Sequence, residues 1–345
     1  MTADRALFDP KADSPAADEY LHALKVRYQA IDIHALALHT LEETLGIAPV
    51  AVRSLGGGEN AMDHVLLLVE AVYKGEHKEF VVRVNTSPVP EPRLLLEARL
   101  YALWQSKGVP TPRVYGVRLR TQTYPYDYMV RDKVGDLNFE TYRRSRYNSV
   151  ATTRSVGAFL ANLHDVPLHG FGPFASGYAD GHLVGVYDSW EEAIREDVEG
   201  TLGYLERAEI INAETAERSK RTFEQYKSLL TLPKGVLLHG DFHPANVLVY
   251  ADTGLVAGAV DLSQAKVGDP LFDIAFYGTY DIETFSEFMT GYAEVRPLPE
   301  DSRERLALYS LRILMSKAKL RKRFGYEDRI AAAIVGMEDA LRVLG

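Results

Sequence analysis

The chain has 345 residues, of which 46% are hydrophobic and 25% charged, as in an ordinary globular protein large enough for two lobes or domains. Acidic side chains outnumber basic ones by 48 to 39, and the resulting net charge of -9 argues against nucleic acid as the main partner. The same sign would favour a cationic small molecule. The chain has no cysteine, which excludes disulfides, thiolate catalysis and cysteine-ligated zinc. No apolar run approaches the roughly 20 residues of a membrane span, and the polar, acidic N-terminus does not resemble a secretory signal. We therefore expect a cytoplasmic protein without membrane contact.

The N-terminal part of the sequence predicts an antiparallel sheet accompanied by helices. Residues 1–18 lack periodic apolar positions and predict a mobile tail. Apolar residues at helical spacing predict helices over Ile31–Leu45 and Pro92–Lys107, each followed by a glycine suited to ending it. Runs of β-branched and apolar residues predict strands over Val50–Leu55, Val65–Tyr73, Phe80–Val84, Val114–Leu119 and Tyr126–Val130.

Three consecutive glycines, Gly56, Gly57 and Gly58, lie between the first two predicted strands. Glycine lets a backbone approach phosphate groups closely, and a flexible hairpin tip is the simpler alternative. The stretch is not a dinucleotide-binding turn, because a strand follows it and not a helix. It is not a Walker A loop either, because no Gly-Lys-Ser/Thr follows.

The C-terminal part of the sequence predicts mainly helices. Val150–His164 is strongly amphipathic, Tyr187–Leu230 predicts two or three helices, and Glu283–Gly345 predicts helix throughout. Asp269 is placed as the N-cap of a further helix that begins at Pro270. A basic run predicts a charged helix surface, and it comprises Lys317, Lys319, Arg321, Lys322 and Arg323.

Between these regions lies a polar stretch, His239 to Asn246, which two short apolar strands enclose. A loop held at both ends by strands is a common place for catalytic residues. Asp241 could accept the proton of an attacking hydroxyl. Asn246, together with Asp261 at the end of a third strand, offers the hard oxygen ligands that magnesium prefers. This set fits phosphoryl transfer from a magnesium nucleotide.

A hydrolase metal site is the competing interpretation of the same stretch. His239, Asp241 and His243 alternate, and alternate residues of an extended strand share a face. That interpretation leaves Asn246 and Asp261 without a role, whereas phosphoryl transfer uses both. We therefore favour phosphoryl transfer.

The segments HGDFHPANVLV and AVDLSQAKVGDPLFDIA resemble the aminoglycoside phosphotransferase and choline kinase superfamily. The resemblance implies an α+β, two-lobed, protein-kinase-like fold. Its nucleotide-binding lobe of antiparallel sheet and one main helix would span residues 1–132. Its larger, mainly helical catalytic and acceptor-binding lobe would span residues 133–345. The implied cofactors are ATP and Mg²⁺, and the implied partner is a small molecule with a hydroxyl acceptor, which could be cationic.

The resemblance also implies roles for residues of the first lobe. Arg83 stands where the family usually has the strand lysine that holds the nucleotide phosphates, and Glu97 is similar to the helix glutamate that pairs with that cation. The glycines Gly56–Gly58 would cover the phosphates. The stretch around Asp132 and Val134 resembles the interlobe hinge whose backbone binds adenine. In the second lobe, Asp273 would bond the backbone of the catalytic loop.

Two short motifs bear on the identity of the acceptor. The motif Arg83-Val84-Asn85 and the phrase Phe171-Gly172-Pro173-Phe174 resemble hygromycin-kinase-like members. A kinase of a primary metabolite and a catalytically dead binding module remain as alternatives, whereas protein kinase activity is disfavoured because no D-F-G or A-P-E motif is present. A carboxylate cluster could bind the ammonium groups of an acceptor or form a solvated helix face, and it comprises Glu191, Glu192, Glu196, Asp197 and Glu199.

Overall fold

The computed structural model describes residues 31–57, 64–85, 93–145, 149–175, 181–323 and 325–345. These residues form two compact units. The first contains the described residues up to Gly135 together with Gly258–Ser263. The second contains those of Asp136–Ala257 and Gln264–Gly345. The chain therefore returns briefly to the first unit before it completes the second.

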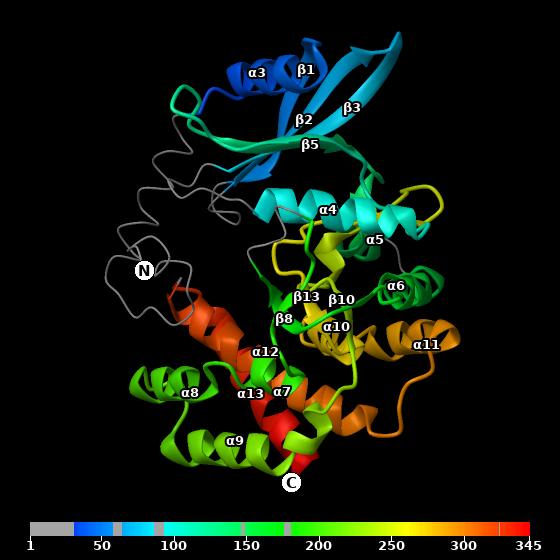
Figure 1. The fold of residues 1–345 in the computed structure, drawn as a ribbon. Coiled ribbons are helices and arrows are strands. Elements are labelled where there is room, and N and C mark those ends of the chain that lie inside the picture. The colour runs from blue at the N-terminus through cyan, green and yellow to red at the C-terminus, as the bar shows by residue number, and fades with distance from the viewer. Residues whose placement is uncertain (1–30, 58–63, 86–92, 146–148, 176–180, 324) are drawn as a thin grey trace. The chain divides into compact units, whose positions relative to one another are not determined.

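The first unit is built on a five-stranded antiparallel sheet (Figure 1). The strand order is β1-β2-β3-β5-β4, and every neighbouring pair is antiparallel. Each of the five strands falls where sequence predicts one. Their bounds are β1 (Pro49–Gly57), β2 (His64–Tyr73), β3 (Glu76–Asn85), β4 (Val114–Arg118) and β5 (Asp127–Asp132).

Helix α3 (Ile33–Leu45) covers one face of this sheet. Asp32 caps its N-terminus by accepting from the backbone N–H groups of His34 and Ala35, each at 3.0 Å, so the helix starts two residues later than predicted. Leu36 and Leu41 pack with the inward side chains of β2, β3 and β5 in one buried apolar cluster. This cluster is the core of the unit.

The opposite face of the sheet carries polar side chains. Arg83 lies on β3 opposite Met129 of β5, and Arg131 lies opposite Val81 in the same two strands. Helix α4 (Arg93–Ser106) contributes buried Leu94, Leu96, Leu100 and Trp104 together with the buried carboxylate of Glu97. Because strand residues alternate between faces, the side chains of Arg83 and Arg131 share the face that is not covered by α3.

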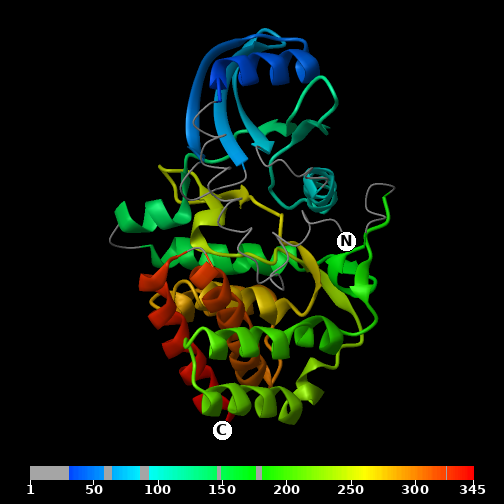
Figure 2. The same ribbon diagram turned by 90° about the vertical axis from the view of Figure 1, so that its left-hand side faces the viewer.

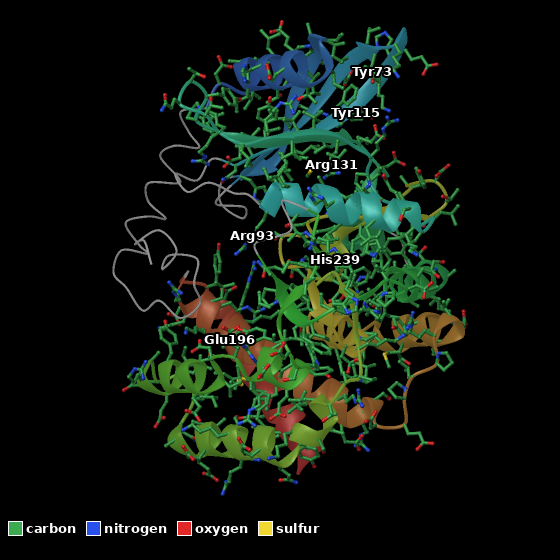
Figure 3. The ribbon with its side chains drawn as sticks, in the orientation of Figure 1. Tyr73, Arg93, Tyr115, Arg131, Glu196 and His239 are labelled. Carbon is green, nitrogen blue, oxygen red and sulfur yellow. The ribbon has the colours of Figure 1, made fainter. Side chains whose placement is uncertain are left out.

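A cluster of aromatic rings lies at one end of the sheet. The rings of Tyr73 and Tyr115 (labelled in Figure 3) meet edge-on at 5.7 Å, and each also meets Phe80. Lys78 donates to the Tyr115 hydroxyl at 2.7 Å and pairs with Asp132 at 2.8 Å. The carboxylate of Asp132 is thereby engaged within the unit.

Two small sheets belong to the second unit, except for the last two residues of strand β12, Gly258 and Ala259. One has the order β7-β10-β13-β8-β9, and the other has the order β12-β11-β6. The pairing of β10 with β13 is antiparallel, with Leu237 opposite Val267. The strand bounds are β6 (Leu137–Asn138), β7 (Pro167–Leu168), β8 (Phe171–Phe174), β9 (Gly185–Tyr187), β10 (Gly235–Leu238), β11 (Val247–Val249), β12 (Val256–Ala259) and β13 (Lys266–Gly268).

Helices make up most of the rest of this unit. Helix α9 lies beside the end of the chain (Figure 2), where its Arg218 donates to the carbonyl of Leu341 at 2.9 Å. No helix in the described ranges is long and apolar enough to cross a membrane. The helix bounds are α5 (Phe139–Ser145), α6 (Val150–Leu163), α7 (Trp190–Arg195), α8 (Val198–Arg207), α9 (Ala213–Gln225), η2 (Lys227–Leu230), η3 (Pro244–Asn246), α10 (Pro270–Gly278), α11 (Phe285–Val295), α12 (Ser302–Arg323) and α13 (Glu327–Leu344).

The structure corrects two expectations for the C-terminal region. Helix is not continuous from Glu283, because residues 296–301 form a connection between α11 and α12 that contains two prolines, which lack the N–H a helix needs. The basic run is not a charged surface throughout. Lys317 and Lys319 are only 8% and 3% exposed. Their long apolar stems make burial possible, which a charge pattern alone does not reveal.

Helices α6 and α11 pack side by side with their backbones close together (Figure 1). A Cβ atom added at Gly157 of α6 would lie 2.1 Å from the carbonyl oxygen of Phe288, and one at Gly291 of α11 would lie 2.0 Å from that of Arg154. Both distances are far below van der Waals contact, so only glycine permits this approach. In contrast, a Cβ at Gly336 of α13 would meet only the flexible end of the Leu314 side chain, at 2.7 Å.

We predict that Gly157→Ala lowers the free energy of unfolding by about 1–3 kcal/mol or more, because backbone must move to admit the methyl group. Gly336→Ala is the matched control. It also replaces a helical glycine, gains up to about 1 kcal/mol of helix propensity and displaces only a side-chain end. Urea unfolding of both variants checks this prediction. Equal stability of the two variants would contradict the close approach of α6 and α11.

Candidate active site

A buried carboxylate fixes the loop that follows β10. Asp273 of α10 is fully buried, and its two oxygens accept from the backbone N–H groups of His239 at 2.7 Å and Gly240 at 2.8 Å. The helix itself is anchored by Asp269, which accepts from the Leu271 N–H at 2.9 Å as its predicted N-cap. The predicted bonding of Asp273 to the catalytic-loop backbone is therefore present.

The loop has room for no other residue at Gly240. Its φ is +81°, a left-handed conformation that favours glycine. A Cβ atom there would lie 1.9 Å from the backbone oxygen of Gln264. The first turn of the loop is thus determined by its backbone, and this turn directs the next residue, Asp241.

A hydrogen-bonded chain continues behind Asp273. His164 is fully buried at the end of α6, with Nε2 at 3.1 Å from Asp273 Oδ2 and Nδ1 at 2.9 Å from the Tyr292 hydroxyl. Burial acts to raise the pKa of Asp273, but the hydrogen bond and charge of His164, His239 and the Gly240 N–H outweigh it, so this pKa lies below its usual value. Asp273 therefore stays ionised and holds the loop amides.

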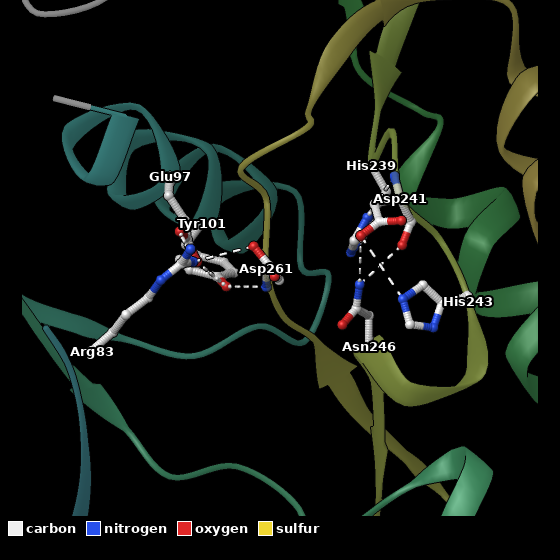
Figure 4. A network of polar contacts seen from close by, with 8 residues as sticks. All are labelled: Arg83, Glu97, Tyr101, His239, Asp241, His243, Asn246 and Asp261. Carbon is white, nitrogen blue, oxygen red and sulfur yellow. Dashed lines mark hydrogen bonds and ion pairs between the residues drawn. The ribbon is translucent and has the colours of Figure 1, made fainter. Parts of the chain in front are cut away.

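Asp241, Asn246 and His243 converge in the same loop (Figure 4). The side-chain amide of Asn246 donates to the carbonyl of Asp241 at 3.0 Å and approaches its carboxylate at 3.4 Å. His243 Nδ1 accepts from the Ala245 N–H at 3.3 Å, so a neutral ring carries its proton on Nε2, which lies 3.8 Å from Asp241 Oδ2. The Asp241 side chain keeps 25% exposure, which leaves it accessible to a substrate.

The first unit assembles a second polar network around Arg83 (Figure 4). The Arg83 guanidinium pairs with Glu97 of α4 at 2.7 Å and with Asp261 at 3.2 Å. Arg83 and Glu97 are 9% and 2% exposed, whereas the side chain of Asp261 is one-third exposed. Asp261 has φ +66°, an uncommon conformation for a residue other than glycine. The expected pairing of the strand cation with the helix glutamate is therefore present.

Tyr101 joins this network, and sequence reasoning did not identify it. Its hydroxyl donates to Glu97 Oε1 at 2.8 Å and accepts from the backbone N–H of Asp261 at 3.2 Å. Burial and the adjacent Glu97 carboxylate raise the pKa of Tyr101 well above its usual value, so the hydroxyl remains a donor. Its spacing of four residues from Glu97 on one helix face was the available signal.

The remaining predicted nucleotide residues differ in how far the structure describes them. Gly56 and Gly57 pair with Leu66 and Val65 at the end of β1. Gly58 lies outside the described residues. The N–H of Asp132 already donates to the Arg113 carbonyl at 2.8 Å. No described residue accepts from the N–H of Val134, which follows β5.

The acidic cluster on α7 and α8 is largely engaged within the protein. Glu191 pairs with Arg195 at 3.1 Å, and Glu192 closes a capping box with Ser189 at the start of α7. Arg195 also pairs with Glu224 of α9. Side chains of both signs line a cavity of about 710 Å³ between these helices, among them Arg195, Asp197, Glu199, Lys220, Arg221 and Glu224.

The residues predicted to hold magnesium have suitable chemistry. Asn246 uses its NH₂ group on Asp241, so its amide oxygen is the atom left for a cation. Asp261 offers a partly exposed carboxylate. Magnesium is usually bound by one or two protein oxygens together with phosphates and water, and each of these residues offers an oxygen of that kind. The described residues contain no cluster of three or more His, Asp or Glu that could hold a metal without such help.

Two features are typical of a kinase-like phosphotransferase. One is a buried carboxylate that fixes a loop with an accessible Asp and an Asn, and the other is a strand cation paired with a helix glutamate. The sequence profile described as "Phosphotransferase enzyme family" matches residues 69–309, well over half of the chain. The chain belongs to this family. Its enzyme class is that of phosphotransferases that act on the alcohol groups of small molecules. No curated protein matches the sequence.

Solved structures confirm the predicted α+β, protein-kinase-like fold. The aminoglycoside phosphotransferase APH(4)-Ia, in a ternary complex with ADP and hygromycin B, is 18% identical with a TM-score of 0.67, over 89% of this chain and 98% of that one. A Thermobifida fusca protein assigned as a fructosamine-3-kinase is 20% identical with a TM-score of 0.64, over 91% and 99%. APH(2")-IIa with streptomycin and ATP is 17% identical with a TM-score of 0.55, over 90% and 97%.

We predict that Asp273→Asn lowers the free energy of unfolding at neutral pH by about 3–5 kcal/mol, because an amide cannot accept from both loop N–H groups as the carboxylate does. Since the native pKa of Asp273 is lowered, its contribution is complete above its unfolded value of about 3.9 and is lost as pH falls through the native value. Urea unfolding at several pH values should show the difference from the native protein shrinking below about pH 4. The exposed Asp252→Asn is the control, and an unchanged difference at low pH would contradict the prediction.

We predict that Tyr101→Phe costs about 1–3 kcal/mol of unfolding free energy, because Glu97 and the Asp261 N–H each lose a partner. Tyr124→Phe is the matched control, since the Tyr124 hydroxyl is buried and has no hydrogen-bond partner in the described part of the chain. Removal of the Tyr124 hydroxyl should leave the free energy of unfolding equal to that of the native protein or raise it. Urea unfolding measures both variants. An equal decrease in their free energies of unfolding would show that the hydrogen bonds of the Tyr101 hydroxyl do not stabilise the protein.

Proposed function

We propose that this protein is an ATP-dependent small-molecule kinase that transfers the γ-phosphoryl group of Mg-ATP directly to a hydroxyl of a small polar acceptor. The observation that carries the proposal is the catalytic loop: a buried Asp273 holds its backbone, while Asp241 remains accessible with Asn246 against it. Complexes of similar structures with ADP or ATP support the choice of nucleotide.

Asp241 acts on the acceptor. Its carboxylate orients the attacking hydroxyl and accepts its proton as the new P–O bond forms. Asn246 fixes the rotamer of Asp241 through the hydrogen bond at 3.4 Å, and His243 presents an N–H toward the same oxygen. A general base of this kind contributes about 10²–10⁴-fold to the rate.

Arg83 and the glycine strand end act on the nucleotide. An arginine fork can grip phosphate oxygens bidentately, and its pairing with Glu97 and Asp261 holds the guanidinium in place before the nucleotide binds. We propose that Gly56, Gly57 and Gly58 approach the phosphates with their backbone. We assign the adenine contacts to the Asp132 carbonyl and the Val134 N–H, because the Asp132 N–H is already engaged.

Asn246 and Asp261 would hold Mg²⁺ through the amide oxygen and the carboxylate. When bound, the cation neutralises phosphate charge and favours charge transfer to the leaving group. Arg83 pairs with the carboxylate of Asp261, and the Tyr101 hydroxyl accepts from its N–H, so both hold Asp261 in position.

The likeness to APH(4)-Ia agrees with a hygromycin-kinase-like branch of the family. A cytoplasmic location fits ATP as the phosphoryl donor.

We predict that Asp241→Ala loses at least about 10²–10⁴-fold in kcat while it retains nucleotide binding. Asp261→Ala should lose turnover nearly completely and also weaken Mg-ATP binding. Both side chains are partly exposed, so unfolding temperatures should change little. ADP release with a panel of aminocyclitols, sugars and amino alcohols measures turnover, and calorimetry measures nucleotide binding.

The exposed Asp252→Ala, on the turn after β11, is the control and should match the native enzyme. Near-native turnover in Asp241→Ala or Asp261→Ala would refute the assignment. Mg-ATP binding without turnover on any acceptor would favour the catalytically dead binding module instead.

A further inference from the structure

Lys317 places a buried ammonium group near the catalytic loop. The residue lies in α12, is 8% exposed, and donates one hydrogen bond, from Nζ to the Thr279 hydroxyl at 2.6 Å. An ammonium group has three donors. No carboxylate in the described ranges lies within ion-pair distance of it. The protonated form of Lys317 is therefore only partly compensated by the described part of the fold.

Aromatic rings orient this ammonium group. Nζ lies 3.5 Å from the centre of the Tyr280 ring and 4.3 Å from that of Phe276. The Tyr280 ring stacks in turn on His243, with centres 4.4 Å apart and planes 14° from parallel. His243 faces Asp241 at 3.8 Å. A continuous series of contacts thus joins Lys317 to the catalytic loop within the second unit.

The charge of Asp241 acts on Lys317. Burial lowers the pKa of Lys317 well below its usual value, and attraction to Asp241 opposes that shift. The charges that act on the neighbouring Tyr280 are mixed: Arg321 and Arg329 are positive, whereas Asp241 and Glu140 are negative. Asp241 is thus the carboxylate that acts on Lys317, and that carboxylate is assigned to the acceptor hydroxyl.

Lys319, two residues further along α12, is a buried lysine that has a counter-ion within the chain. It is 3% exposed, pairs with Asp197 of the α8 N-terminus at 3.6 Å, and lies over the Tyr204 ring at 5.3 Å. A buried ammonium without such a counter-ion is costly. An anion from outside the chain would supply this missing partner and would favour the protonated form of Lys317.

We propose that Lys317 is the anion-binding residue of the acceptor site and that the acceptor carries a carboxylate or phosphate in addition to its reacting hydroxyl. This proposal rests on the proposed kinase function and names the acceptor class. The anionic group of the acceptor pairs with Lys317 while the hydroxyl lies at Asp241. The Tyr280 and His243 rings set the spacing between the two.

A polycationic acceptor fits this surface less well. Lys317, Arg321 and Arg329 would repel ammonium groups next to the reacting hydroxyl. The carboxylates of α7 that could attract them are engaged by Arg195 and by the capping box. The negative net charge of the whole chain therefore does not determine the acceptor, because contacts through Tyr280 and His243 join a basic side chain, Lys317, to Asp241.

The test compares acceptors that differ in charge but share a polyhydroxylated frame. Gluconate and glucose 6-phosphate supply the two anionic groups, glucose is uncharged, glucosamine is cationic, and kanamycin is a polycation. Two readouts are used: kcat/KM from ADP release, and the shift in unfolding temperature that each compound causes without nucleotide. We expect at least one anionic compound to exceed glucose about tenfold in kcat/KM, which corresponds to about 1.4 kcal/mol, and to raise the unfolding temperature.

Lys317→Met keeps the length of the side chain and removes its charge. We expect it to fold with equal or higher stability, to lose the preference for the anionic acceptor mainly through KM, and to lose the temperature shift. Lys319→Met is the matched control, a buried lysine of the same helix, and should retain the preference in spite of its lost ion pair. Lys317→Arg should restore part of the preference.

Three outcomes would overturn the proposal: no anionic compound affects the native protein in either readout, the preference persists in Lys317→Met, or kanamycin is the better acceptor. The temperature shift does not depend on turnover. An anion-dependent shift that requires Lys317, in a protein that transfers no phosphoryl group, would therefore retain the anion site and refute the kinase function. Transfer to an uncharged or cationic acceptor in preference to both anionic compounds would retain the kinase function and refute the anion site.

Discussion

The carboxylate of Asp273 supports the geometry on which the candidate active site depends. It holds two successive backbone N–H groups of a loop whose turn only glycine can make, and it is itself kept charged by His164. Because both oxygens are used, the direction of the loop at Gly240 is fixed before any substrate arrives. The side chains of Asp241 and Asn246 extend from that fixed backbone, so their positions depend on a residue that never contacts a substrate.

At position 83 the basic side chain that we assign to the nucleotide phosphates is an arginine and not the lysine usual in the family. A lysine is a point charge that can satisfy one carboxylate closely, whereas the planar fork of Arg83 pairs with Glu97 and Asp261 at once. The Tyr101 hydroxyl closes the same network by bonding Glu97 and the Asp261 N–H. This arrangement couples the helix α4 to the residue assigned to magnesium, and the substitution is therefore compatible with an active enzyme.

Sequence reasoning predicted the features that depend on local patterns. The strands of the first unit, the helix at Asp269-Pro270 and the pairing of Arg83 with Glu97 follow from alternation, capping chemistry and family resemblance. The role of Tyr101 and the burial of Lys317 were missed, because both depend on which elements pack together. A basic run on a helix predicts a solvent-exposed face. Its burial becomes evident only from the packing of Lys317 against the rings of Phe276 and Tyr280.

The contact between α6 and α11 has a consequence for how this protein can evolve. Gly157 and Gly291 let the two helices touch, and the same pair of helices supplies His164 and Tyr292, which support Asp273 from behind. A size change at either glycine would therefore move the support of the catalytic loop although it lies outside the site. The residues proposed to bind the acceptor lie elsewhere, on α12 and around Tyr280. Laboratory selection for new acceptors should accumulate changes there and leave the glycine pair untouched.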